Sequence, residues 1–359
     1  MSESIDDRLN PIFIKEKLLE IFDINKNPDD NYTSEYAKLH LHGDVFLDLI
    51  CVYNNGILCY QLNLPSYKNG QYVITGGMNT RCGDNKSGTK NITNIIKFGI
   101  ENGYDIFQLV NMSEINYNFP DKSKVTIQMT ILKLLEIGNS WYSQFGFESE
   151  EKIGLQDGQK IPISKYLQQS ISPIISSSFE NLMVKYNEYV DYLFSQNLIS
   201  SKLQTDAKED FKGNINGYIN EFNKKNIPEL AISNDTIISY YIKKIVGVTI
   251  AMCPRYMCPN NFNRILQQLI DFIYFLSYVV VSVVIKNTVL VTTSDENRIK
   301  DEIIDFIGSN YNNLELNLKD LTSRRIGGKG RKIIKKNKKC ITRRKKYKRI
   351  KKSRKSTRK

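Results

Sequence analysis

The chain has 359 residues, of which 51 are Lys or Arg and 38 are Asp or Glu, for a net charge of +13. Of these bases, 21 fall between Arg324 and Lys359, where there is no acid, so the rest of the chain has 30 bases against 38 acids. An acidic body therefore precedes a strongly basic segment. The length and a hydrophobic fraction of 41% exclude a wholly disordered chain and predict two folded regions.

The basic C-terminal segment has little apolar surface to bury, so it is predicted to be disordered by itself. Lysines and arginines that neutralise phosphates release counterions, so DNA or RNA is the leading partner. The composition is also typical of a nuclear or nucleolar address, of an arm for anionic lipid and of a solubilising tail. The predicted nucleic-acid-binding residues are Lys335, Lys336, Lys338, Lys339, Arg343, Arg344, Lys345, Lys346, Lys348, Arg349, Lys351, Lys352, Arg354 and Lys355.

The N-terminus and the cysteines predict an intracellular protein. Glu3, Asp6 and Asp7 precede any apolar stretch, which is not typical of a secretory signal. Six cysteines are scattered without framework spacing, which predicts reduced thiols. Heavy use of Asn, Ile, Lys and Tyr is typical of translation from an AT-rich genome.

One apolar run could be taken for a membrane span. Residues 272–285 read FIYFLSYVVVSVVI, without charge, between Asp271 and Lys286. A span needs about 20 residues, so a buried helix or strand is favoured over this run crossing a membrane. Extension across Lys286 keeps one alternative open, a tail-anchored, membrane-associated protein held through residues 269–291.

The N-terminal half predicts an α/β layer. Two β-rich runs, 44–53 and 57–64, flank Asn54-Asn55-Gly56 and predict a hairpin. A third strand, 71–75, leads into a glycine-rich loop.

A crossover unit follows this loop. Thr89 is predicted to cap a helix that ends at Gly103, and 104–110 reads as a buried strand. The strands on either side of that helix should be parallel neighbours in one sheet. A second amphipathic helix is predicted over 125–137.

The remainder predicts a mainly helical region after a polar connector, 156–165. Apolar residues recur at helical spacing up to residue 248, although 279–285 and 288–292 are β-branched enough to be strand. The predicted organisation is an N-terminal extension (1–43), an α/β domain (44–155), a mainly helical domain (156–322) and a disordered Lys/Arg-rich tail (323–359).

The glycine-rich loop after the third strand is a candidate phosphate site. Backbone N–H groups and the positive end of the following helix bind phosphate without specialised side chains, and Arg81, Lys86 and Lys90 would add charge. The loop has neither a GxxxxGK[ST] nor a GxGxxG motif, so an ordinary surface loop is the alternative.

Tyr142, Gly146 and Phe147 follow the second predicted helix with a Tyr, then Gly-Phe four and five residues later. In this spacing residues 44–147 resemble GNAT-type N-acetyltransferases, which implies an acetyltransferase-like mixed sheet with flanking helices. The resemblance also implies acetyl-coenzyme A as cofactor, with a strand that offers backbone groups to pantetheine and a loop that holds pyrophosphate. By order in the chain, these positions are Val73, Ile74, Thr75, Arg81, Gly83, Lys86, Gly88 and Thr89.

Tyr142 stands where the family has the tyrosine that protonates the leaving thiolate, a reasonable role for a phenol of pKa near 10. The alternative is an aromatic cluster with Trp141, Phe145 and Phe147 that seals the helix onto the sheet. The family's [QR]xxGx[GA] loop is not present in register after Arg81.

A narrower resemblance concerns origin. NMSEI at 111–115, followed by LLEIGNSWYSQFGF, looks like uncharacterised proteins of giant DNA viruses that also carry Lys/Arg-rich C-terminal tails. This implies a viral protein that acts in the host cytoplasm or nucleus, or in the virion.

The only two histidines, His40 and His42, could form a Cys₂His₂ zinc site with Cys253 and Cys258. The two pairs lie more than 200 residues apart, so a buried thiol and a surface histidine pair are favoured and no metal is predicted.

The sequence thus predicts an intracellular protein that binds nucleic acid non-specifically, or is targeted to the nucleus or virion core, through its basic tail. Two alternatives concern the body: an acyl-coenzyme A-dependent N-acetyltransferase, or a degenerate transferase fold that binds a protein partner.

Overall fold

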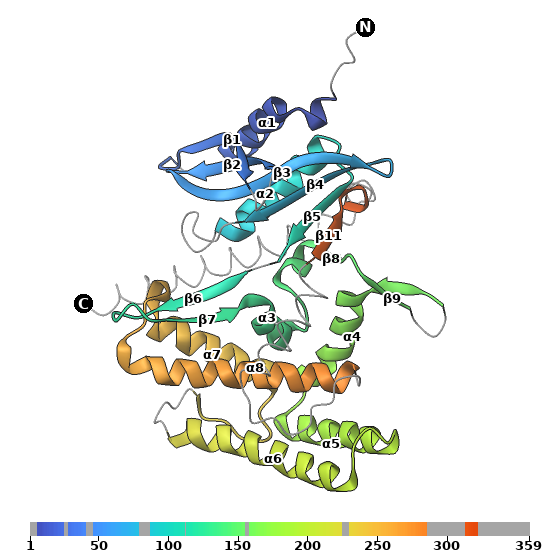
Figure 1. Ribbon diagram of the computed structural model, residues 1–359. Helices are drawn as coiled ribbons and strands as arrows, with labels where there is room; N and C mark the ends of the chain where they lie inside the picture. Colours follow the sequence, from blue (N-terminus) through green and yellow to red (C-terminus); the bar gives the residue numbers. More distant parts are fainter. Residues whose placement is uncertain are drawn as a thin grey trace, which may run out of the picture. The chain divides into compact units, whose positions relative to one another are not determined.

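A computed structural model of the chain describes residues 6–24, 28–40, 46–78, 87–111, 113–154, 158–224, 230–285 and 313–321 (Figure 1). The chain divides into two compact units, one of Met1–Gln108 with Leu316–Lys359 and one of Leu109–Glu315. The predicted basic tail lies outside the described residues.

The first unit begins with helices and continues into an antiparallel meander. Its elements are η1 (Asp7–Leu9), α1 (Pro11–Ile24), β1 (Tyr32–His40), β2 (Phe46–Asn54), β3 (Ile57–Lys68) and β4 (Gln71–Met78). Asn55 and Gly56 join β2 to β3 with φ of 50° and 76°, and the two strands pair antiparallel. The hairpin predicted at Asn54-Asn55-Gly56 is therefore confirmed, because these residues tolerate the left-handed region.

The predicted crossover unit is also present. Helix α2 (Ser87–Glu101) connects β4 to β5 (Ile106–Val110), and β4 and β5 are neighbours in the sheet. The backbone N–H of Asp105, just before β5, donates to the carbonyl of Tyr72 at the start of β4, at 2.9 Å. The two strands thus begin at the same end of the sheet and run parallel, as expected.

The main sheet is mixed and has seven strands in the order β1-β2-β3-β4-β5-β11-β8, where β11 is Asn313–Asn317 and β8 is Glu148–Ser149. The predicted α/β class is confirmed at this level. Helix α1 packs on β1 and β2 and buries Ile14, Leu18 and Phe22. The division between the units falls within β5 and β11.

The helix predicted over 125–137 is wrong in its first turn. Residues 124–128 form β7 (Lys124–Gln128), which pairs antiparallel with β6 (Glu114–Asn118), and the helix α3 is only Met129–Ile137. Val125 and Ile127 are buried while Lys124 is exposed and Thr126 half-buried, which is the alternation of a strand. The β-branched side chains of this segment favour that conformation.

The second unit is mainly helical, as predicted. Its long helices are α4 (Ile163–Ile175), α5 (Phe179–Ser195), α6 (Ser201–Lys224), α7 (Ile238–Met252) and α8 (Asn263–Ile285). Among its described residues are the short 3₁₀ turns η2 (Trp141–Phe145), η4 (Pro254–Tyr256) and η5 (Asn260–Phe262).

Two other expectations for this unit are corrected. The connector predicted at 156–165 contains a strand, β10 (Lys160–Pro162), which pairs with β9 (Lys152–Gly154), and α4 begins at Ile163. Residues 279–285 are helical and not strand, because burial within α8 outweighs the weak strand preference of Val and Ile. Residues 288–292 lie outside the described part.

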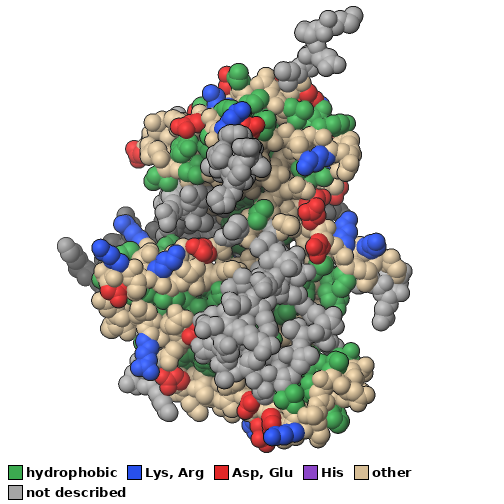
Figure 2. Space-filling view, in the orientation of Figure 1, with side chains coloured by type: hydrophobic (Ala, Val, Ile, Leu, Met, Phe, Trp, Pro, Cys, Tyr) green, Lys and Arg blue, Asp and Glu red, His purple; other side chains and the backbone are tan. Residues whose placement is uncertain are grey.

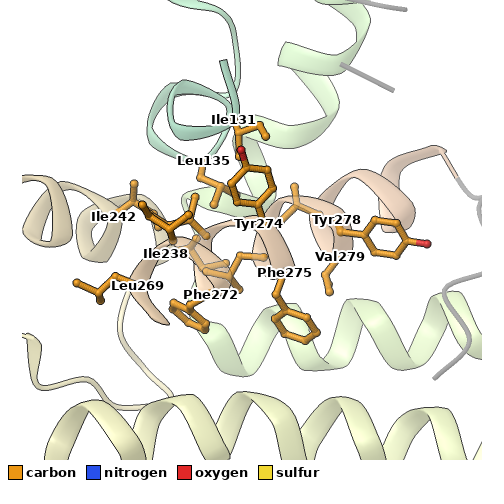
Figure 3. Close-up of a cluster of buried hydrophobic side chains, with 14 of the residues drawn as sticks. Ile131, Leu135, Ile238, Ile242, Leu269, Phe272, Tyr274, Phe275, Tyr278 and Val279 are labelled. Atoms are coloured by element: carbon orange, nitrogen blue, oxygen red, sulfur yellow. The ribbon is translucent and has the colours of Figure 1, made fainter. Parts of the chain in front are cut away.

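Helix α8 is the centre of the second unit's core. Figure 3 shows Ile131 and Leu135 of α3, with Ile238 and Ile242 of α7, on one side of α8, while Phe272 and Phe275 point toward the other side. On that other side their rings contact the aromatic rings of α6. Helix α3 thus shares one hydrophobic core with α4–α8, and the boundary predicted between residues 155 and 156 lies inside this unit.

Candidate functional site

The residues expected to hold pantetheine lie in β4. Val73 and Ile74 are buried and Thr75 is half-buried. Farther along the strand, a Cβ at Gly76 would lie 2.1 Å from the hydroxyl oxygen of Tyr60, so only glycine fits beneath that ring.

The loop expected to hold pyrophosphate is only partly described. Gly88 and Thr89 lie in the first turn of α2, whereas Arg81, Gly83 and Lys86 lie outside the described residues. Thr89 is not the residue that precedes the helix, because Ser87 and Gly88 already belong to it. Its predicted capping role is therefore wrong, in the way that helix starts are often misplaced by two residues. Lys90 pairs with Asp30, at 3.7 Å.

Tyr142 lies in η2 and is 4% exposed. Its ring makes edge contacts with Trp141 and Phe147, at centroid distances of 5.0 Å and 6.0 Å. Its hydroxyl lies 3.2 Å from Oγ of Ser113. The tyrosine thus takes part in the aromatic cluster that the sequence offered as the alternative to catalysis, and it also has a polar contact.

Burial raises the pKa of the Tyr142 phenol, and the hydrogen bond with Ser113 opposes that shift only in part. The phenol therefore keeps its proton at neutral pH. Chemically, it can donate a proton to a group placed beside it, as a weaker acid than a free phenol, and it cannot act as a phenolate base.

Ser113 is the partner that the sequence did not indicate. It follows β5, and its carbonyl accepts a hydrogen bond from the N–H of Met129, the first residue of α3, at 2.9 Å. Asn111 donates through Nδ2 to Oγ1 of Thr130, at 2.6 Å. The end of β5, the start of α3 and Tyr142 are thereby joined by polar contacts within the second unit. A polar Asn-x-Ser directly after a buried strand was the available signal.

The positions implied by the resemblance do not all belong to one unit. Val73, Ile74, Thr75, Gly88 and Thr89 lie in the first unit and Tyr142 lies in the second. An acetyl-coenzyme A site that includes both sets therefore stays a prediction.

The cysteines differ from expectation. Cys253 and Cys258 form a disulfide with Cα atoms 4.2 Å apart, because the turn between α7 and α8 brings them together. Cys59 is also disulfide-bonded, and Cys51 is a buried free thiol whose pKa is raised by burial. The prediction of reduced thiols is wrong for the three bonded residues.

Cys253 and Cys258 cannot serve as the thiolate ligands of a shared zinc site while they are joined in this disulfide. His42 lies outside the described residues, and the side chain of His40 is not described. Among the residues that the structure does describe, no group of three or more His, Cys, Asp or Glu side chains could hold a metal ion.

The apolar run at 272–285 forms most of α8. Within the described part of the chain, residues Asn260–Val284 are the one helical stretch long and apolar enough to cross a membrane, and 78% of their most apolar window is buried in the protein. Core helices of soluble proteins have the same composition. Residues 272–285 are helical and the side chains from Phe272 to Val283 are buried, which confirms the favoured interpretation of a buried helix, while 286–291 lie outside the described residues.

The basic tail follows an attachment that the sequence analysis also missed. Leu318 is 1% exposed, and its N–H donates to the carbonyl of Asp105 at 2.9 Å. Nζ of Lys319 lies 2.7 Å from Oδ1 of Asp105, whose other oxygen accepts from the N–H of Tyr72. Burial opposes ionisation of Asp105, but these hydrogen bonds outweigh it and hold the pKa of Asp105 below its ordinary value. The chain is therefore fixed to the first unit a few residues before Arg324.

Acidic and basic side chains are mixed over the visible face of the described body, which carries no broad single-sign surface there (Figure 2). The strongest charge asymmetry of the protein therefore remains the one in its sequence, at 324–359.

The chain matches no protein-family model, and no curated protein is significantly similar to it.

Proposed function

We propose that this protein binds DNA or RNA non-specifically through residues 324–359. The observation that supports the proposal is the concentration of 21 bases, without an acid, behind a body that has more acids than bases. Each base that neutralises a phosphate releases condensed counterions, which gives affinity that does not depend on sequence and falls with salt. The same segment can serve to target the protein to the nucleus or the virion core.

The attachment of the segment fits this role. Lys319 and the buried Leu318 hold the chain on the first unit a few residues before the basic segment in the sequence. The acids of the body repel phosphates and leave nucleic acid to the segment.

The test is filter binding of DNA and RNA by the full chain and by a variant with Lys335, Lys336, Lys338 and Lys339 changed to Gln. We expect affinity for both nucleic acids to fall by more than about tenfold at low salt, since four phosphate contacts are lost. The matched control changes two exposed lysines of α6, Lys202→Gln and Lys212→Gln, and should retain nucleic acid like the parent chain. Equal retention by all three proteins would remove the proposal.

A second candidate function, which the resemblance implies, is acyl-coenzyme A-dependent N-acyl transfer. The observation that favours it is the buried, protonated Tyr142 beside Ser113. In such a reaction the acceptor amine forms a C–N bond to the acyl carbon, the C–S bond breaks, and the phenol gives its proton to the departing thiolate. The phenolate then recovers a proton from the amine product through solvent.

Isothermal titration with acetyl-coenzyme A decides this second candidate, with Tyr142→Phe as the matched variant. If the enzyme hypothesis holds, both proteins bind the cofactor, and only the variant fails to transfer the acetyl group to an amine. Absence of both heat and thermal shift would eliminate the enzyme and leave the body as a degenerate transferase fold. That fold would then have to capture a protein partner in a pull-down.

A further inference from the structure

A second charge asymmetry lies inside the folded body. Between Asp235 and Asp271 the chain has four bases, Lys243, Lys244, Arg255 and Arg264, and no acid. The body as a whole has more acids than bases, so this stretch departs from its surroundings. It contains α7 and the disulfide-closed turn that follows it.

One face of α7 is open to solvent. Its inner face is buried through Ile238, Tyr241, Ile242, Ile245 and Thr249. The opposite stripe, with the residue that precedes the helix, is what we call the α7 outer face: Ile237, Tyr240, Lys243, Lys244, Gly247, Ile250 and Ala251. These positions recur at three- and four-residue spacing and therefore lie along one side of the helix.

The α7 outer face is apolar as well as basic. Ile250 is 59% exposed, Tyr240 57% and Ile237 46%. The ammonium of Lys244 lies 5.2 Å from the centre of the Tyr240 ring. A Cβ at Gly247, in the middle of the stripe, would meet no atom within 4 Å, so the helix backbone is uncovered there.

The disulfide turn adds exposed groups of the same kind directly after α7. Arg255 is exposed, Tyr256 is 40% exposed and Met257 is 54% exposed. The turn is held by the Cys253–Cys258 bond and by a hydrogen bond from the N–H of Cys258 to the carbonyl of Asn118, at 2.8 Å. These exposed side chains are therefore presented on a fixed backbone.

We propose that the α7 outer face binds an anionic lipid surface. Lysines attract the acidic headgroups, and exposed Ile and Tyr side chains enter the region between headgroups and acyl chains. The absence of acids from 236–270 removes the repulsion that the rest of the body would meet. Nucleic acid accounts for the lysines and Tyr240, but it offers the aliphatic side chains of Ile237 and Ile250 little apolar surface to bury against.

The experiment is co-sedimentation of the full chain with vesicles of mixed phosphatidylcholine and phosphatidylserine. The tail attracts such vesicles too, but its attraction is screened at high salt and is the same in every variant. The apolar variant is Tyr240→Ser with Ile250→Ser, and we expect about tenfold weaker partitioning, most evident at high salt. The charge variant, Lys243→Gln with Lys244→Gln, should weaken low-salt partitioning by about fivefold for each lysine.

Two controls keep the result interpretable. Val184→Ser, combined with Lys202→Gln and Lys212→Gln, removes an exposed aliphatic and two exposed lysines from α5 and α6, and should partition like the parent chain. Gly247→Leu adds an apolar side chain in open space on the outer face and should strengthen partitioning. Because it also improves helix propensity, loss of folding would not explain its result.

The proposal fails if the apolar variant partitions like the control, or if Gly247→Leu has no effect. It also fails if the charge variant loses DNA retention in filter binding while its vesicle partitioning stays unchanged. The α7 outer face would then bind nucleic acid and not lipid. If the tail proves not to bind nucleic acid, the comparison of vesicle partitioning between the α7 variants and the parent chain keeps its meaning.

Discussion

The two compact units are stabilised in different ways. In the first unit, charged hydrogen bonds join the starts of β4 and β5 to the chain after β11, and Asp105 is their common partner. In the second unit, aromatic and aliphatic side chains surround α8, and Phe272 has ring contacts on three other helices. Acid should therefore weaken the network around Asp105 in the first unit, and loss of side-chain volume should weaken the core around α8 in the second.

The polar network of the first unit extends to the N-terminus. Asp6 accepts hydrogen bonds from the backbone and guanidinium of Arg8 and from the hydroxyl of Tyr72. The guanidinium of Arg8 also lies 3.5 Å from the centre of the Tyr72 ring. These bonds hold the pKa of Asp6 well below its ordinary value. The hydrogen bonds at the start of β4 thus have the ionised carboxylates of Asp6 and Asp105 as acceptors.

The largest expected effect comes from Phe272→Ala in the second unit. Phe272 is fully buried, with Tyr218 at 4.8 Å and Phe222 at 5.5 Å between ring centres. Loss of the ring should lower the free energy of unfolding by about 3–5 kcal/mol, because it leaves a cavity in the core. Denaturant unfolding measures this, and exposed Val184→Ala should change it by less than about 0.5 kcal/mol. An equal effect of both changes would show that α8 is not the centre of the core.

The next effect is that of Asp105→Asn in the first unit. The Asp105 side chain is 10% exposed and Lys319 62% exposed, so solvent screens the pair in part. We expect a loss of about 1–2 kcal/mol at neutral pH. Because the folded pKa of Asp105 is depressed, its contribution is complete well above the ordinary value of 3.8 and disappears as pH falls through the folded value.

Stability measured against pH tests this sign. The parent chain and Asp105→Asn should converge as acid is added, whereas Phe272→Ala should stay below the parent by a nearly constant amount. Glu209→Gln, an exposed change on α6, is the matched control and should follow the parent throughout. A difference between parent and Asp105→Asn that persists in acid would show that the carboxylate charge is not what matters.

The smallest effect compares a glycine in each unit. A Cβ at Gly99 in α2 would lie 2.6 Å from Cδ1 of Leu318, so Leu318 would have to move. A Cβ at Gly217 in α6 would meet open space. Gly217→Ala should therefore stabilise the protein by up to about 1 kcal/mol, because Ala has a higher helix propensity than Gly. Gly99→Ala should show no such stabilisation, because the new methyl group would clash with Leu318. Thermal melting measures both changes. An equal rise in Tm would show that the Leu318 side chain moves aside without a loss of stability.

Local chemistry explains what the sequence could predict of the fold. Asn54-Asn55-Gly56 specifies its hairpin by backbone freedom alone, and the loop–helix–strand order after Gln71 specifies parallel neighbours. Val125–Gln128 could not be separated from the following helix, because Ile127 and Ile131 are spaced four residues apart and continue a helical stripe. The pairing that makes 125–128 a strand comes from residues 114–118, and propensity does not contain it.

The sequence indicated which residues belong to the candidate site, but it did not indicate which other residues they contact. Tyr142 stands out through its spacing to Gly146 and Phe147, but its burial and its contact with Ser113 depend on how α3 packs at the end of β5. The Cys253–Cys258 bond depends in the same way on the turn between two helices. The lone acid Asp105 at the start of an apolar strand was visible, but its partner Lys319 lies more than 200 residues away.

The salt dependence of nucleic-acid binding tests the central claim most directly. The logarithm of the association constant should be measured against the logarithm of salt concentration, for the full chain and for a chain with the fourteen predicted tail bases changed to Gln. The account predicts a steep negative slope for the parent, about 0.9 for each duplex phosphate neutralised, and a much shallower slope with weaker binding for the variant, which keeps seven of the 21 bases. The same slope and affinity for both chains would contradict it.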